Sequence, residues 1–216
     1  MLPGPTIYRE CPSCNKPFTE HSLTSGNTFG AVYWSDGKMD AEMLPEFPAI
    51  VKCPDCNNIF WISDATVIGM YDWFRGEDYE EPEEWKKAKS VIDLKIEDYI
   101  TAIEEKVFSG DDNREEYLRI HLWWLINDLI RYENRQPGLF KQHNDMFRAN
   151  LKHLDKLLRC KDDDEKLMKA EIARELGEFD LCVNRLEDVS NARGNVCRQI
   201  NQFVQCKSQI VQRINN

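Results

Sequence analysis

The sequence predicts an α+β protein with a small β-rich domain built around two cysteine pairs, followed by an all-α domain of helical hairpins. Two C-P-x-C segments and short β-type runs lie in the first third of the chain. An acidic stretch follows, and beyond it apolar residues recur at three- and four-residue steps, which is typical of helices. We therefore expect the β-rich domain at residues 1–76, an acidic connector at 77–90 and the helical domain at 91–216.

The β-rich assignment depends on turn punctuation and short apolar runs up to about Trp73. The run from Phe29 to Trp34 is followed by the turn dipeptide Asp36-Gly37, a pattern that predicts a hairpin. Residues Glu77 to Glu84 then include six acidic side chains and Pro82. That composition favours a solvated connector, and we place the domain boundary there.

Helical periodicity begins after this connector. Ser90 and Asp93 offer start signals for a first helix that we expect to run to about Phe108. A second helix is expected at 115–131, and further apolar stripes predict helices at 147–158, 167–176 and 179–186. The segment 196–214 has apolar residues on one side and glutamines on the other, so we expect a terminal capping helix.

Four cysteines form two C-P-x-C knuckles, whose spacing lets a tight turn aim two thiolates at one ion. Proline fixes the φ angle that begins such a turn, and asparagine at the position after the second cysteine tolerates a left-handed conformation. Asn15 and Asn57 occupy these two positions. We predict one Zn²⁺ bound in a zinc ribbon by a set of four ligands, Cys11, Cys14, Cys53 and Cys56.

The 38 residues between the two knuckles exceed the usual length for a compact zinc site, so a folded hairpin insertion is expected there. Four protein ligands leave no open coordination position for water, which predicts a structural rather than a catalytic ion. A rubredoxin-like iron site uses the same knuckles and would imply electron transfer. The ligands alone do not discriminate zinc from iron.

The charge of the chain disfavours nucleic-acid binding. The net charge is -10, and residues 1–74 alone carry four basic side chains against nine acidic ones, a net charge of -5. Four thiolates on one divalent cation add a further -2. Because binding to phosphates depends on a basic surface, a nucleic-acid-associated ribbon remains only a secondary hypothesis.

The expected location is cytoplasmic. The first ten residues show neither a basic start nor an apolar signal region, and no stretch reaches the roughly 18 apolar residues of a membrane span. Eight cysteines in a reducing compartment are expected to be thiols or metal ligands rather than disulfides.

The remaining reactive side chains show no catalytic pattern. Cys160, Cys182, Cys197 and Cys206 are predicted within helices as packing residues, and His121 as a packed helix residue beside Trp123 and Trp124. The run 162–165 is expected to begin and cap a helix. Phosphate-binding loops, nucleophile elbows and dinucleotide fingerprints do not occur, so the sequence offers no support for an enzyme.

Several segments together resemble an uncharacterised bacterial family in which a double C-P-x-C ribbon precedes helical hairpins. The matching segments are GNTFGAVYWSDGK, MLPEFPAIVKCPDCNNIFWI, YLRIHLWWLIND and LMKAEIARELGEFD. Residues 167–189 also resemble a tetratricopeptide hairpin, with small residues at Ala170 and Ala173 and Gly177 in the turn. They depart from that pattern at Lys166, where tryptophan is usual, and at Cys182, where alanine is usual. The resemblance implies architecture and no reaction.

These observations favour a zinc-stabilised interaction or adaptor protein that presents a tetratricopeptide-like surface to a protein or peptide partner. Adjacent helix residues point about 100° apart, so one ring of the Trp123-Trp124 pair is a candidate anchor for that partner.

Overall fold

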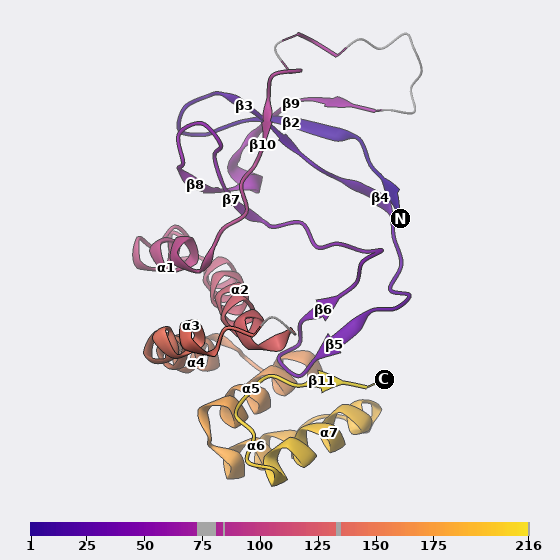
Figure 1. Cartoon of the computed structure of the whole chain (residues 1–216), viewed down its shortest axis with the longest axis vertical. Helices are drawn as coiled ribbons and strands as arrows, with labels where there is room; N and C mark the ends of the chain where they lie inside the picture. The colour runs from indigo at the N-terminus through magenta and orange to yellow at the C-terminus, as the bar shows by residue number, and fades with distance from the viewer. Residues whose placement is uncertain (73–80, 84, 133–134, 216) are drawn as a thin grey trace. The chain divides into compact units, whose positions relative to one another are not determined.

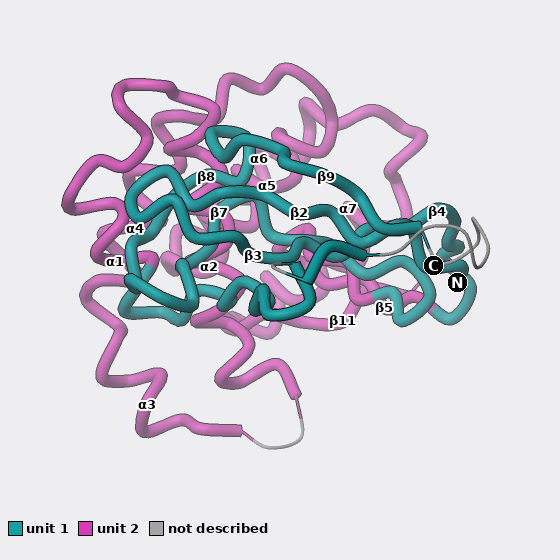
Figure 2. Tube along the Cα trace, turned by 90° about the horizontal axis from the view of Figure 1, so that it is seen from above, with its two compact units in different colours: residues 1–30, 41–98 teal, residues 31–40, 99–216 magenta. Residues whose placement is uncertain are grey.

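A computed structural model of the chain describes residues 1–72, 81–83, 85–132 and 135–215 (Figure 1). It divides into two compact units, which Figure 2 shows in different colours. Unit 1 comprises residues 1–30 and 41–98, and unit 2 comprises residues 31–40 and 99–216. Residues 77–80 and 84 of the predicted acidic connector lie outside the described residues.

Unit 1 is built from short antiparallel pairs. Its four-stranded sheet has the order β10-β3-β2-β9, in which only the pairing of β10 with β3 is parallel, and two-stranded sheets pair β1 with β4 and β7 with β8. The elements are β1 (Leu2–Pro3), β2 (Thr6–Glu10), β3 (Pro17–Glu20), β4 (Leu23–Ser25), β7 (Ile50–Lys52), β8 (Ile59–Trp61), the 3-10 turn η1 (Ile62–Asp64), β9 (Thr66–Tyr71) and β10 (Lys89–Ser90).

The core of unit 1 forms directly around the first cysteine of each knuckle. Phe18, Val51 and Phe60 are buried together with Cys11 and Cys53, and the rings of Phe18 and Phe60 lie 5.3 Å apart. This apolar cluster is small for the unit it supports, so the buried side chains of Cys11 and Cys53 contribute to the core of unit 1.

The hairpin predicted at 32–37 is present, but it belongs to unit 2. Strands β5 (Val32–Trp34) and β6 (Met39–Asp40) pair across the turn at Asp36-Gly37, where Gly37 has φ +84°. The segment β11 (Arg213–Ile214) pairs with the other edge of β5. The insertion between the knuckles is therefore folded, as its length predicts, and it packs with the helices that follow residue 98.

Unit 2 is otherwise helical, and most of the predicted helices are observed. The helices are α1 (Ile96–Glu104), α2 (Asp112–Arg131), α3 (Pro137–Gln142), α4 (Asn144–Leu157), α5 (Asp163–Leu176), α6 (Phe179–Glu187), the 3-10 turn η2 (Asn191–Arg193) and α7 (Gly194–Gln205). The side chain of Asp162 caps α5 as expected, by accepting a hydrogen bond from Glu165. Helix α2 begins at Asp112, earlier than the predicted 115, because Asp111 accepts hydrogen bonds at its start. No helix in the described part of the chain is long and apolar enough to cross a membrane.

Helices α5 and α6 form an antiparallel hairpin, as the sequence predicts. Gly177 ends α5 with φ +84°, and the N–H of Glu178 reaches the carbonyl of Ala173, which closes a left-handed helix end. Ala170, Ala173 and Cys182 are completely buried between the helices. The structure shows a helical hairpin here, and its tetratricopeptide character stays a prediction.

The first predicted helix begins later than the start signals suggested. Ser90 lies in β10 beside β3, and Ile92 pairs with Lys52 through two backbone hydrogen bonds. These β contacts hold the backbone extended, and α1 begins only at Ile96, where the Asp98 side chain accepts from the N–H of Lys95. The helix ends at Glu104, before a left-handed residue at position 106.

The last predicted helix is wrong beyond Gln205. Lys207 has φ +50°, and the N–H of Ser208 bonds to the carbonyl of Phe203, which closes α7. The apolar residues Val211 and Ile214 are buried in an extended segment instead of a helix. The pairing of this segment with β5 competes successfully with helix propagation because it buries the same side chains.

A buried polar network holds the hairpin in unit 2. Asp36 accepts hydrogen bonds from both terminal nitrogens of Arg131, at 2.6 and 3.0 Å, and both side chains are fully buried. Asn127 donates to Asp36 at 2.9 Å, and the half-buried Trp124 donates its indole N–H to the Asp36 carbonyl at 3.0 Å. Fully buried Trp123 donates to Glu175 at 2.7 Å. The tryptophan pair is thus engaged with the chain itself.

Candidate metal centre

Each C-P-x-C knuckle connects two strands of a short hairpin. The first lies between β2 and β3 and the second between β7 and β8. In the first, the N–H of Asn15 bonds to the Cys11 carbonyl at 2.9 Å, and in the second the N–H of Asn57 bonds to the Cys53 carbonyl at 3.0 Å. The two turns therefore have the same backbone geometry although their flanking sequences differ.

The predicted left-handed positions are both observed. Asn15 has φ +56° and Asn57 has φ +59°. This conformation reverses the chain directly after the second cysteine of each pair, so that both sulfur atoms of a knuckle point to the same side. A β-branched residue would be strained at either position.

The four sulfur atoms lie within 4.8 Å of one another. The Sγ atoms of Cys11 and Cys56 are 3.8 Å apart, and so are those of Cys14 and Cys53. Four sulfurs at about 2.3 Å from a central ion form a tetrahedron with edges of about 3.8 Å. The cysteines are thus positioned to hold one metal ion between the two knuckles.

Backbone amides point at the first sulfur of each knuckle. The N–H groups of Ser13 and Asp55 lie 3.5 Å from the Sγ atoms of Cys11 and Cys53, respectively. Hydrogen bonds of this kind stabilise thiolates, because they place partial positive charge against the sulfur. The first cysteine of each knuckle is buried, whereas Cys14 is half-buried and Cys56 exposed.

The surroundings of Cys11, Cys53 and Cys56 shift the pKa values of these three thiols. Burial raises the pKa of Cys11. The amide of Asn58 lowers the pKa of Cys56, but desolvation and the neighbouring thiols raise it, to about 12. Burial also acts to raise the pKa of Cys53, but backbone hydrogen bonds from Cys56 and Asp55 outweigh it and leave that pKa lowered. Cysteine ligands bind a metal as thiolates, so metal binding and loss of the thiol protons are coupled.

Two lysines place positive charge beside the second knuckle. The Nζ atom of Lys89 lies 2.8 Å from an oxygen of Asp55, and that of Lys16 lies 3.6 Å from it. The hydrogen bond from Lys89 lowers the pKa of Asp55. Lys89 falls in the segment predicted as a connector, and its position here depends on the pairing of β10 with β3, for which the sequence has no clear signal.

The other candidate residues belong to unit 2. Cys182 is buried in the core of unit 2, as predicted, but Cys160 and Cys206 are exposed positions just beyond helix ends rather than within helices. His121 stacks on Tyr117 with ring centroids 3.9 Å apart, and burial lowers its pKa to about 4. His121 is therefore a packed helix residue, as expected.

Comparison of the chain with protein-family models, with curated proteins and with solved structures finds no match. Of the architecture that the family resemblance implied, the structure shows the four-cysteine cluster and a helical C-terminal region.

Proposed function

We propose that Cys11, Cys14, Cys53 and Cys56 bind one structural zinc ion that stabilises unit 1. The observation that carries this proposal is the tetrahedral spacing of the four sulfur atoms, with 3.8 Å between Cys11 and Cys56 and between Cys14 and Cys53. Since Cys11 and Cys53 are also core residues, metal binding and folding of this unit are coupled.

The ligand set supports a structural role because four protein thiolates fill a tetrahedral coordination sphere. Iron in the same sphere would serve electron transfer, and the sulfur geometry is compatible with either metal. Zinc is the better candidate in a packed site that contributes to a small core.

Metal analysis of the purified protein tests the site, with about one zinc per chain expected. A coloured protein that contains iron would support the rubredoxin-like alternative, and metal-free folded protein would contradict both. Cys53→Ser should abolish stoichiometric binding, whereas Cys160→Ser, at an exposed position outside the cluster, should leave it unchanged.

The wider function that we propose is that of a cytoplasmic interaction protein whose helical unit contacts a protein or peptide partner. The α5–α6 hairpin supports this proposal, since stacked helical hairpins commonly present binding surfaces. The anchor is not the tryptophan pair, because Trp123 is buried and Trp124 bonds to Asp36. Leu181, on α6, is a large apolar side chain that remains 38% exposed.

Crosslinking in the cells that produce the chain tests this wider proposal. A partner captured by the wild type should be lost with Leu181→Glu and retained with Cys206→Ser. If both variants capture the partner equally, Leu181 on α6 does not belong to the contact surface. Binding to DNA or RNA that weakens with salt would instead support the nucleic-acid hypothesis.

A further inference from the structure

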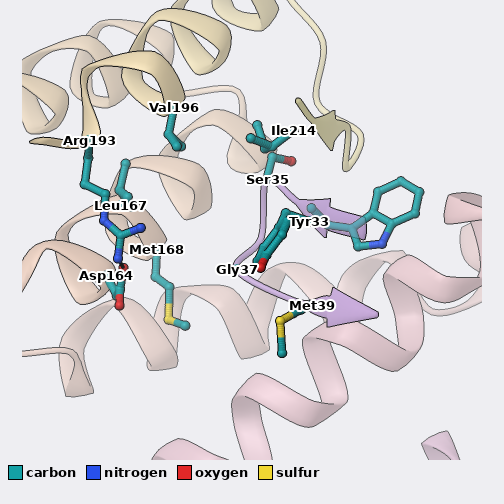
Figure 3. A pocket seen from close by; sticks show the side chains of 11 residues that line it. Tyr33, Ser35, Gly37, Met39, Asp164, Leu167, Met168, Arg193, Val196 and Ile214 are labelled. Carbon is teal, nitrogen blue, oxygen red and sulfur yellow. Dashed lines mark hydrogen bonds and ion pairs between the residues drawn. The ribbon is translucent and has the colours of Figure 1, made fainter. Parts of the chain in front are cut away.

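Unit 2 contains a half-enclosed cavity of about 390 Å³ between its hairpin and its helices, shown in Figure 3. This volume lies within the roughly 300–1,000 Å³ of small-molecule sites. The walls come from strand β5 and the turn after it, from β6, α5, the start of α7 and β11, and they are mainly apolar: Tyr33, Met39, Leu167, Met168, Val196 and Ile214.

The walls are held in place by an ion pair and by hydrogen bonds within unit 2. The buried Asp36–Arg131 ion pair fixes the hairpin turn. Ser35 and Gln212 exchange hydrogen bonds, with the Ser35 N–H 2.8 Å from the Gln212 carbonyl and the Gln212 N–H 3.0 Å from the Ser35 hydroxyl oxygen. The strand that contains Ile214 is therefore fixed against β5. Because these walls cannot move inward, the cavity stays open.

Two polar groups in the cavity have hydrogen-bonding capacity left over. Within the described part of the chain, the Tyr33 hydroxyl has no hydrogen-bond partner, and the Arg193 guanidinium bonds only to Asp164, through one nitrogen at 2.6 Å. Figure 3 shows Arg193 beside Asp164 at one side of the cavity, with the apolar side chains beyond it. A guanidinium carries five N–H donors, so several remain for a ligand.

We propose that this cavity binds a small carboxylate with an apolar body, its carboxylate on Arg193 and its apolar part against Met39, Met168 and Val196. Arginine recognises carboxylates through paired N–H donors. Methionine side chains adapt to apolar ligands of irregular shape. The Tyr33 hydroxyl offers a further donor to the ligand.

The Asp164 carboxylate does not prevent this binding. The side chains of Arg193 and Asp164 are 47% and 65% exposed, and ion pairs with such exposure stabilise a protein little. A ligand carboxylate can therefore replace Asp164 on the guanidinium or share it. A cationic ligand is disfavoured, because it would have to compete with Arg193 for the same carboxylate.

Titration calorimetry with three eight-carbon probes tests the proposal on the full chain: octanoate, octan-1-ol and octylammonium. Octanoate should bind with a stoichiometry of one and more tightly than either of the others. Absence of saturable octanoate binding, or tighter binding of octylammonium, would overturn the proposal.

Arg193→Met keeps an apolar stem and removes the charge, and it should weaken octanoate binding at least tenfold while changing octan-1-ol binding less than twofold. Arg198→Met is the control, since Arg198 is an exposed arginine of α7, the helix that follows Arg193, and does not line the cavity. Equal weakening of both probes, or equal effects of the two variants, would contradict recognition of the carboxylate by Arg193.

Val196→Trp fills the cavity and should abolish binding of both probes. Circular dichroism and a thermal unfolding curve establish that this variant is folded. Octanoate binding that survives in a folded Val196→Trp protein would place the ligand elsewhere and overturn the proposal. This test is independent of the metal site, because every residue involved belongs to unit 2.

Discussion

One buried ion pair, Asp36–Arg131, contributes to holding the hairpin in unit 2, and Asp36→Asn would disrupt it. The substitution keeps the size of the side chain and an oxygen that can still accept from the Lys38 N–H, so the turn itself is preserved. It removes the negative charge that faces the Arg131 guanidinium. It also places an amide N–H₂ group near the donor groups of Arg131 and Asn127, which then have one acceptor fewer. The change therefore isolates the electrostatic contribution of Asp36.

The expected loss is about 3 kcal/mol of unfolding free energy. Removing one partner of a buried ion pair costs roughly 3–5 kcal/mol. The lower end applies here, because Arg131 keeps a hydrogen bond from Nε to Asp128 at 2.7 Å. Burial, Glu171 and Asp36 all raise the pKa of Glu175, so loss of the Asp36 charge also relieves some repulsion. For a domain of this size, the midpoint of thermal unfolding should fall by roughly 10 °C.

Urea unfolding followed by circular dichroism at a helical wavelength measures this loss. The double variant Asp36→Asn/Arg131→Met should recover about half of it, since no buried cation is then left without a partner. Arg159→Met is the control, because the Arg159–Asp112 pair is about 60% exposed on both sides and should contribute less than about 1 kcal/mol. A loss below 1 kcal/mol for Asp36→Asn would refute the reasoning.

Three further predictions concern unit 2 and are measured by urea unfolding. Burial lowers the pKa of His121 to about 4, so the unfolded state binds the proton first as pH falls from 6.5 towards 4. The wild type should lose about 2 kcal/mol more than His121→Phe between pH 7 and pH 5; equal losses would contradict this assignment. Gly177→Ala should lower the unfolding free energy by about 1–2 kcal/mol, because φ is +84° and a Cβ would lie 2.8 Å from Gln209 Nε2. Truncation after Lys207 should cost about 3 kcal/mol or more, since it removes buried apolar side chains and carbonyl partners of Arg174; an unchanged midpoint would show that the tail is not part of the fold.

The sequence by itself determined the features that depend on neighbouring residues. Each knuckle is complete within five residues, so the cysteine spacing and the left-handed asparagines at 15 and 57 were predictable from local geometry. The caps at Asp111 and Asp162 and the glycine end at position 177 follow from the same short-range rules. The four candidate ligands therefore follow from the local sequence alone.

Only the tertiary structure decided which unit contains the hairpin and what covers its edge. Asp36 meets Arg131, which is 95 positions away, and Ser35 meets Gln212, which is 177 positions away. The three-residue spacing of Val211 and Ile214 favours a helix, and the extended conformation was decided instead by pairing with the edge of β5. The cavity beside Arg193 has no sequence signal for the same reason: its walls come from segments whose proximity is set by long-range contacts.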